Sequence, residues 1–477
     1  MKRAIPALLC GVLLSACTVI GPNYERPKID APASWRIDYG EAAEVANARW
    51  WEQLDDPVLN QLIDDALRAN PDLRAAAGRV DQFIGALTSA RALYYPQVGY
   101  SFDASRNRAS ERAFPGTNGI DPYYNLYQGA LSASWQIDLF GRVQRQSEAA
   151  QARVYASEQG RRGVVLSVVS SVAAAYVTLR GFDHQLEIAR ATAQNYAQTV
   201  NLFDLRFKGG VVSMVEVTQA DSQYQQALAA IPALEDQIAA QENLISILLG
   251  RNPGPIPRGK PLMALVPPKI PADLPAGLLE RRPDIMQAEQ TLIATNADIG
   301  YARSLYYPTF SLTGLLGSVS VALGDFLTGP ARIATLAAGL SGPIFTGGAI
   351  EGQVATAEGA QREALALYER TILNAFRETN DALVGSQKKR QEAELQARRV
   401  ISLREYARLA RLRFEEGATS YQEVLYAENE LFNAELVVVR TQTERYLRLV
   451  DVYRSIGGGW VDWADELTVK PVGTLKQ

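Results

Sequence analysis

The chain has 477 residues, and its 48 Lys and Arg nearly balance its 52 Asp and Glu, so the formal net charge is only −4. This balance excludes the basic surface that nucleic-acid binding needs. One His, two Cys and four Met offer few ligands for a metal, and neither a Walker motif nor a catalytic constellation accompanies them. We therefore expect no enzyme, no cofactor and no metal site.

The N-terminus has the pattern of an export signal. Lys2 and Arg3 precede an apolar run over 4–14, which is too short for a permanent membrane span. Leu14-Ser-Ala-Cys17 then resembles a bacterial lipobox, which predicts a signal peptide over 1–16 and an acylated Cys17. An ordinary signal peptide with an incidental cysteine is the alternative. Thr18, in place of the Asp common in inner-membrane lipoproteins, points to the outer membrane.

The next elements have the two-residue period of strands. Apolar and polar residues alternate from 98 to 105 and, less regularly, from 124 to 135, with the polar segment 106–122 between them. Segments 310–321 and 333–341 form a second pair later in the chain. The alternation predicts four strands of about ten residues. An ordinary soluble sheet remains the alternative, because single transmembrane strands give weak signals.

Long helices follow each pair of strands. No proline occurs from Tyr123 to Ile231, and residues 143–207 would form a helix of roughly 100 Å. Its last part has the three- and four-residue spacings of a coiled coil, which resume after Gly209-Gly210 on a returning helix. The same device recurs over 400–414 and 424–438. Each half is thus predicted to end in a helical hairpin.

The chain contains similar halves. Arg91-Ala-Leu-Tyr-Tyr-Pro-Gln returns as Arg303-Ser-Leu-Tyr-Tyr-Pro-Thr, and Leu205-Arg-Phe-Lys-Gly-Gly returns as Leu412-Arg-Phe-Glu-Glu-Gly. A duplicated unit of this kind usually builds one symmetric object. Four strands cannot close a barrel, and an open edge is costly in lipid. Membrane insertion therefore requires several chains: two would supply eight strands and three would supply twelve.

Several motifs in one order resemble the outer-membrane efflux channel family, and more narrowly its lipoprotein branch serving tripartite multidrug pumps. They are the lipobox with Gly21-Pro-Asn-Tyr24, the paired Tyr-Tyr-Pro segments, Leu278-Leu-Glu-Arg-Arg-Pro-Asp284 and Ile456-Gly-Gly-Gly-Trp460. The resemblance implies an α+β membrane protein. Its homotrimer would form a 12-stranded transmembrane β-barrel, four strands per chain, continued by a long periplasmic α-helical coiled-coil barrel.

The resemblance also implies partners and a division of the chain. The partners would be outer-membrane lipid, a periplasmic adaptor and an inner-membrane RND-type pump, with the channel passively conducting drugs or other small molecules. The expected parts are a signal peptide (1–16), a lipidated segment with equatorial residues (17–70), the first repeat (71–252), a proline-rich connector (253–283), the second repeat (284–456) and a C-terminal equatorial segment (457–477).

Site residues follow from matched positions in the hairpins. Glu216 and Glu423 lie just after the two turns, where the family places acidic groups that narrow the periplasmic end; rings of carboxylates there favour cations and can be bridged by Arg206 or Arg413. A glutamate favoured by the helix dipole is an equally good interpretation. Tyr421 and Tyr426 are the aromatic candidates for the constriction. The expected adaptor contacts are Gly210, Val211, Val212, Gly417, Ala418 and Thr419.

Two other functions fit part of the pattern. A lipid-anchored periplasmic coiled-coil scaffold would need the helices but not the alternating strands. An exit duct for type I protein secretion would need both, and nothing in the sequence defines a substrate pocket. A conductance measurement separates the channel from the scaffold.

Overall fold

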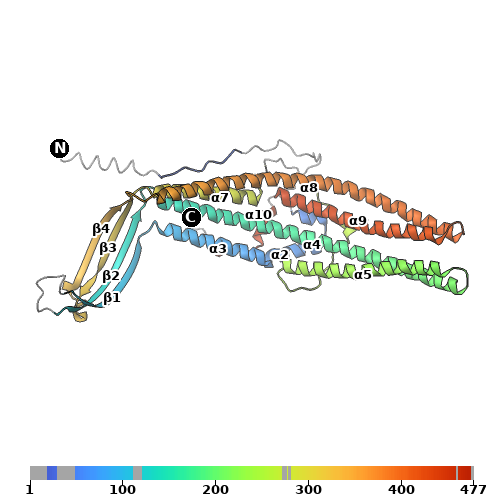
Figure 1. Ribbon diagram of the computed structural model, residues 1–477, viewed down its shortest axis with the longest axis horizontal. Coiled ribbons are helices and arrows are strands. Elements are labelled where there is room, and N and C mark those ends of the chain that lie inside the picture. The colour runs from blue at the N-terminus through green and yellow to red at the C-terminus, as the bar shows by residue number, and fades with distance from the viewer. Residues whose placement is uncertain are drawn as a thin grey trace.

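The computed structural model describes residues 19–28, 49–110, 121–270, 277, 281–457 and 460–473. Figure 1 shows an elongated molecule with a sheet of strands at one end and a long helical body behind it. The predicted signal peptide over 1–16 and the predicted acylation site Cys17 lie outside the described residues.

The sheet contains the four predicted strands: β1 (Gln97–Arg108), β2 (Tyr123–Ile137), β3 (Thr309–Ser320) and β4 (Arg332–Ser341). They are antiparallel in the order β1-β2-β3-β4, so β1 and β4 are edge strands. β1 continues to Arg108, which makes the connection to β2 shorter than the predicted 106–122 loop. Two short 3-10 turns, η4 (Leu323–Asp325) and η5 (Gly329–Ala331), connect β3 to β4.

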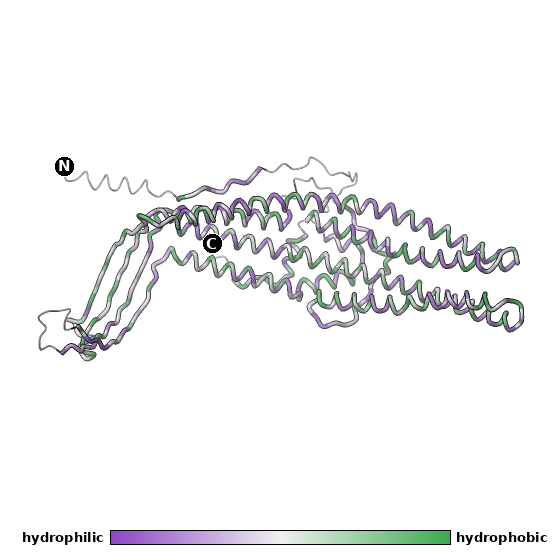
Figure 2. The backbone as a smooth tube through the Cα atoms, viewed as in Figure 1, coloured by the Kyte–Doolittle hydropathy of each residue, from purple (hydrophilic) through white to green (hydrophobic). Residues whose placement is uncertain are grey.

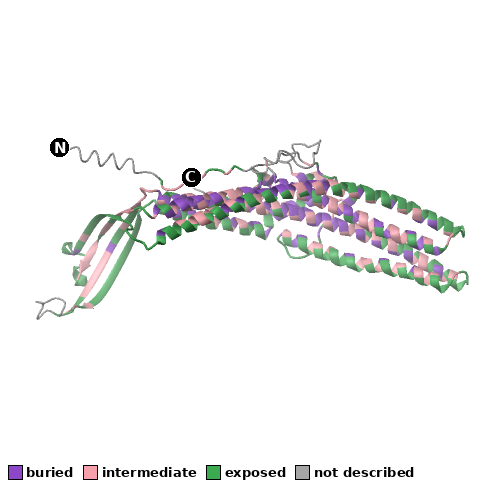
Figure 3. Cartoon of the chain, turned by 45° about the horizontal axis from the view of Figure 1, so that its top comes forward, coloured by how far each residue is buried: buried purple, intermediate pink, exposed green. Residues whose placement is uncertain are grey.

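The sheet has one apolar and one polar face. Tyr100 pairs with Leu131, which pairs with Leu316, so these side chains share a face. Ser101 and Asp103, at alternate positions of β1, belong to the other face. Figure 3 shows that most of the strand residues are exposed in the single chain. An apolar exposed face with a polar opposite face is typical of a transmembrane barrel.

Two helices run the length of the body. α4 (Arg142–Lys208) and α8 (Ala349–Glu415) have 67 residues each, which corresponds to roughly 100 Å. The glycines of α4 do not interrupt it; Gly181, for example, lets Thr443 approach so closely that a Cβ would lie 2.4 Å from the Thr443 Oγ1. Among the described helices, α4 alone is apolar enough over a window to resemble a membrane span, and 56% of that window is buried in the protein. α4 is therefore the core helix of the body.

Shorter helices flank the long pair. Near the strands, α3 (Pro71–Ala92) packs on α4, and α7 (Pro283–Ser304) packs between α4 and α8. Farther away, α5 (Met214–Leu248) packs on α4, and α9 (Tyr421–Ile456) lies between α4 and α8. The body is thus a single curved layer, α3-α4-α7-α8 and then α5-α4-α9-α8 (Figure 1). Figure 2 shows polar and apolar residues interspersed along these helices.

The largest core lies at the middle of the body. It contains Trp50 and Trp51 of η1 (Trp50–Leu54), the apolar side of α2 (Pro57–Ala69), Trp460 of α10 (Trp460–Glu466) and residues of the connector around η2 (Leu262–Ala264). The rings of Trp50 and Tyr453 stack at 5.0 Å. Segments from both ends of the chain and from the connector therefore pack on the middle of α4.

Candidate functional site

The distal ends of the two hairpins have the same backbone turn. Gly210 and Gly417 have φ angles of 72° and 74°, which an L side chain rarely adopts. The Val211 N–H donates to the Arg206 carbonyl at 2.9 Å, and the Ala418 N–H donates to the Arg413 carbonyl at 2.8 Å. The predicted glycine turns are confirmed, with the pattern of a Schellman motif.

Glu216 lies at the third position of α5 and closes a capping box with Ser213. Its Oε2 accepts a hydrogen bond from the Ser213 N–H at 2.9 Å and one from the Ser213 hydroxyl. These bonds favour the charged form and lower the pKa of the Glu216 carboxyl. Glu216 is therefore anionic, and it is half-exposed at the hairpin end.

Glu423 is held differently on the second hairpin. Its Oε1 lies 3.3 Å from Nη1 of Arg413, and its Oε2 accepts a hydrogen bond from the Thr419 hydroxyl. The ion pair is within one chain and joins α8 to α9 across the turn. Arg413 thus pairs with the carboxylate of its own hairpin, and the predicted bridging of a ring of carboxylates stays a prediction.

Arg206 lies on aromatic rings. Its guanidinium carbon is 6.0 Å from the ring centre of Phe203 and 5.9 Å from that of Phe414. Because Phe203 belongs to the first hairpin and Phe414 to the second, Arg206 covers the contact between the two hairpins. Such cation–π contacts contribute about 0.5–1 kcal/mol at exposed sites.

The two tyrosines of the predicted constriction have opposite environments. Tyr421 is only 7% exposed, and its ring centre lies 4.1 Å from that of Phe203. Burial raises the pKa of its phenol. Tyr426 is 62% exposed. Because Tyr421 is enclosed between the hairpins of one chain, Tyr426 is the tyrosine whose ring is available to line a passage.

Two ion pairs between the helices of the second hairpin were not predicted from the sequence. Arg411 pairs with Glu428, and Arg404 Nη2 lies 2.7 Å from Glu435 Oε1, both between α8 and α9. The two pairs have the same midpoint in the sequence, next to the turn. Opposite charges at equal distances from a predicted hairpin turn were the signal that could have identified them.

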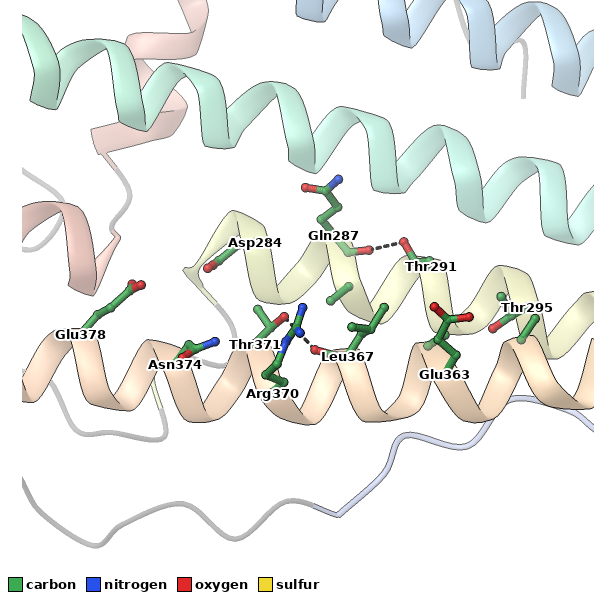
Figure 4. A pocket seen from close by; sticks show the side chains of 13 residues that line it. Asp284, Gln287, Thr291, Thr295, Glu363, Leu367, Arg370, Thr371, Asn374 and Glu378 are labelled. Carbon is green, nitrogen blue, oxygen red and sulfur yellow. Dashed lines mark hydrogen bonds between the residues drawn. The ribbon is translucent and has the colours of Figure 1, made fainter.

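A groove runs between α7 and α8 on the half of the body near the strands. Figure 4 shows its two walls, with Asp284, Gln287 and Thr291 on α7 and Leu367, Arg370 and Asn374 on α8. The groove has a volume of about 620 Å³ and contains no residue set typical of a catalytic site. In the part of the chain that the structure describes, no group of three His, Cys, Asp or Glu could hold a metal ion.

An open four-stranded sheet with one apolar face, joined to two helices about 100 Å long that each end in a hairpin, is the architecture of an outer-membrane channel subunit. The family model described as outer membrane efflux protein matches residues 62–251 and 274–458, and the chain belongs to this family. It is an efflux channel protein of the outer membrane. The family consists of channels and not of enzymes.

Individual relatives are similar to this chain over nearly its whole length. The solvent efflux pump outer membrane protein SrpC of Pseudomonas putida is 32% identical over 458 residues, which cover 94% of this chain and 97% of SrpC. The probable outer membrane lipoprotein SilC of Salmonella typhimurium is 30% identical over 455 residues, with the same coverage. The open state of the Neisseria gonorrhoeae MtrE outer membrane channel superposes with a TM-score of 0.81 at 28% identity, covering 93% of this chain and 99% of MtrE.

Proposed function

We propose that three copies of this chain close a twelve-stranded barrel and a helical tunnel, through which small molecules leave the cell passively. A periplasmic adaptor and an inner-membrane RND-type pump would load the tunnel. The similarity to SrpC, named as part of a solvent efflux pump, supports small organic molecules as the substrates. The proposal rests on one observation: the edge of the chain where β1 lies is complementary to the edge where β4 lies.

The two halves of the chain correspond residue by residue. Gln97 and Thr309, which begin β1 and β3, differ by 212 positions, and their partners Ser134 and Ser341 differ by 207. The residues that precede the long helices, Gly141 and Gly348, also differ by 207. In a ring of chains, each contact between the first and second halves of one chain has a counterpart between the second half of that chain and the first half of the next. The offsets predict which residues form that counterpart.

When these offsets are applied to the sheet, the edge strands of neighbouring chains pair in register. β2 pairs with β3 so that Leu131 faces Leu316. With the offsets above, β4 of one chain pairs with β1 of the next so that Leu340 faces Phe102. Both side chains belong to the apolar face, so the apolar face continues across the junction. This continuity supports a closed barrel, which leaves no open edge in lipid.

The helices also support contacts between neighbouring chains. α4 buries 27 residues and α8 only 14, although both have 67. Gly160 and Gly163 of α4 lie against Gln287 and Pro283 of α7. Their counterparts on α8, Leu367 and Arg370, line the groove of Figure 4. The groove is therefore the expected seat of α3 from the next chain, and Pro71 begins α3 as Pro283 begins α7.

The hairpin ends are proposed as the periplasmic gate and the adaptor contact. Glu216 and Glu423 would line the narrow end, with Tyr426 beside them. Arg413 would neutralise part of the charge through its pair with Glu423. Gly210, Val211 and Val212 of one turn, and Gly417, Ala418 and Thr419 of the other, form the extreme ends of the body, where an adaptor can dock.

A lipid anchor at Cys17 fits the position of the segment that follows it. The Ile20 N–H donates to the Phe140 carbonyl at 3.2 Å, and Nε of Arg145 donates to the Ile20 carbonyl at 3.1 Å. Phe140 lies where β2 leads into α4, at the boundary between the strands and the body. Acyl chains on Cys17, three residues before Ile20, would therefore insert into the membrane beside the barrel.

Native mass spectrometry and planar-bilayer recordings of the purified mature protein test this function together. We expect a mass of three chains and discrete channel conductance. A stable, folded single chain would contradict the proposed assembly, and a trimer that never conducts would favour the lipid-anchored scaffold.

A further inference from the structure

The side of α3 that faces away from α4 is an exposed stripe with helical spacing. Leu73 and Leu87 are buried together with residues of α4 and define the inner side of α3. The opposite side has one residue every three or four positions, all of them exposed: Asp72, Ala75, Arg79, Gln82, Ala86 and Ser89. Its charged residues lie toward the start of α3, near the middle of the body. α3 therefore has a second possible packing face, which its own chain leaves exposed.

α8 has an exposed stripe of the same kind on one wall of the groove in Figure 4. It consists of Ala360, Glu363, Leu367, Arg370 and Asn374. Two acids at one end of the groove are already paired, because Asp284 and Glu378 lie 2.6 Å and 2.9 Å from Nη2 of Arg282. Within the described ranges, the side chains of Glu363 and Arg370 form neither a hydrogen bond nor an ion pair. The groove thus contains two charges of opposite sign without partners in their own chain.

The packing of α4 on α7 predicts how the two stripes meet, and this prediction rests on the proposed trimer. Gly160 of α4 lies against Gln287 of α7. The long helices α4 and α8 begin 207 residues apart, and the short helices α3 and α7 begin 212 residues apart. The counterpart of the first contact is therefore Leu367 of one chain against Ala75 of the next. Each contact combines one large and one small side chain, as close packing requires.

The neighbouring contact brings two opposite charges together. Gly163 of α4 lies against Pro283 of α7, so Arg370 is expected against Pro71 of the next chain, directly beside Asp72. Asp72 is exposed, and in the part of the chain that the structure describes its carboxylate has no hydrogen-bond or ion-pair partner. An ion pair between Arg370 and Asp72 of the next chain would provide that partner.

A second pair of opposite charges follows two helical turns away. The contacts of α4 with α7 show that the helices run antiparallel, so seven residues back on α8 and seven forward on α3 bring Glu363 to Arg79. Arg79 is exposed and, among the described residues, also lacks an ion-pair partner. A shift by two turns would place Arg370 against Arg79, or Glu363 against Asp72. Both shifts bring like charges together, so the charges favour a single register.

We infer that this junction recognises a second copy of the same chain by charge, with Arg370 paired to Asp72 and Glu363 paired to Arg79 of the next chain. Ion pairs that solvent reaches add little affinity, whereas like charges at the same positions repel each other, so the main effect is selectivity. A channel subunit of the same fold with other charges at these four positions would be a disfavoured neighbour.

Charge reversal on one helix tests the pairing. Asp72→Arg/Arg79→Glu keeps the net charge and places like charges at every junction of a trimer. When the purified full-length protein is diluted in detergent, this variant should release roughly tenfold more single chains than the wild type, as counted by native mass spectrometry. Adding Glu363→Arg/Arg370→Glu on the opposite helix restores opposite charges. This fourfold variant should dissociate like the wild type.

Mixed assembly tests the selectivity. The wild type and the fourfold variant are produced in the same cells with tags of different mass, and the masses of the purified trimers are measured. A mixed trimer has two junctions with like charges, so mixed trimers should be roughly tenfold rarer than random mixing gives. Mixed trimers at the random share would overturn the inference.

A matched control reverses two charges beside the stripe. Arg362 and Glu369 are exposed, lie one position before Glu363 and Arg370, and do not line the groove. Arg362→Glu/Glu369→Arg should therefore dissociate like the wild type and mix with it at random. Wild-type stability of the Asp72→Arg/Arg79→Glu trimer, or no recovery in the fourfold variant, would overturn the inference and leave the trimer in place. A single-chain mass for the wild type would overturn the proposed assembly itself, and the junction with it.

Discussion

Nη1 of Arg413 lies 3.3 Å from Oε1 of Glu423, whereas the corresponding glutamate of the first hairpin, Glu216, bonds to Ser213. Arg206, which corresponds to Arg413, instead rests on Phe203 and Phe414. The two hairpins share a turn but hold their glutamates in different ways. Only the second glutamate has its charge partly neutralised by its own chain.

This difference predicts opposite effects on ion selectivity. Glu216→Ala/Glu423→Ala should lower the cation preference of the channel and raise its conductance modestly, because an exposed ion pair contributes only about 0–1 kcal/mol. Arg413→Ala should raise the cation preference, because the Glu423 charge is then uncompensated. Reversal potentials in planar bilayers measure both effects. Glu416→Ala, at the same tip, serves as the control. Unchanged selectivity in both variants would leave the two glutamates as residues favoured by the helix dipole.

The hydrogen bonds from Ser213 predict a pH effect. They lower the pKa of Glu216, so this carboxylate stays charged, and its capping contribution to stability persists, until the pH falls through the lowered value. In Ser213→Ala the pKa rises toward its ordinary range. Cation preference should therefore be lost at a higher pH than in the wild type as the solution is acidified. Ser222→Ala, on the same helix, should titrate like the wild type, and coincident curves for all three proteins would refute the effect.

Cys17→Ser should accumulate as unprocessed precursor or as a poorly anchored protein. The reason is that the lipobox cysteine would supply the acylated first residue of the mature chain. Mass spectrometry of the purified protein and membrane fractionation measure the outcome. A wild-type protein that begins at Met1, or that carries an unmodified Cys17, would contradict the prediction.

Much of the fold follows from local patterns. The four strands, both long helices and both hairpin turns are predictable, because alternation, heptad spacing and glycine turns act over a few residues. The glutamate contacts were not predictable. Glu216 and Glu423 occupy equivalent positions in the two hairpins. Whether Ser213 or Arg413 becomes the partner depends on the side-chain geometry at each turn.

The central core shows the same limit. Trp50 and Trp460 are far apart in the sequence, and their contact at 6.4 Å depends on the whole chain folding back. The resemblance to a family implied that these segments meet, but no spacing in the sequence indicates the geometry. Tyr421 shows the same limit, because the sequence predicts it as a candidate for the constriction, whereas its ring is buried against Phe203 of the other hairpin.

The buried carboxylate of Asp56 predicts a large stability effect. Its Oδ1 caps α2 through the Val58 N–H at 2.9 Å, and its Oδ2 accepts bonds from the Tyr176 hydroxyl at 2.9 Å and the Lys260 N–H at 3.0 Å. Asp56→Ala removes the cap and leaves the buried Tyr176 hydroxyl without its acceptor, which should cost about 2–4 kcal/mol. Thermal unfolding in detergent measures the loss. Asp65 is half-buried on the same helix and accepts a hydrogen bond from the Gln61 side chain. Asp65→Ala should therefore change stability much less, and equal midpoints for the two variants would refute the role of Asp56.

Cross-linking between edge strands tests the central claim most directly. In Phe102→Cys/Leu340→Cys, a short thiol-specific cross-linker should join β4 of one chain to β1 of the next and give covalent dimers and trimers. Asp103→Cys/Leu340→Cys places one thiol on the opposite face and should cross-link poorly. Channels that conduct normally while the Phe102→Cys/Leu340→Cys protein yields only single chains would contradict the closed twelve-stranded barrel.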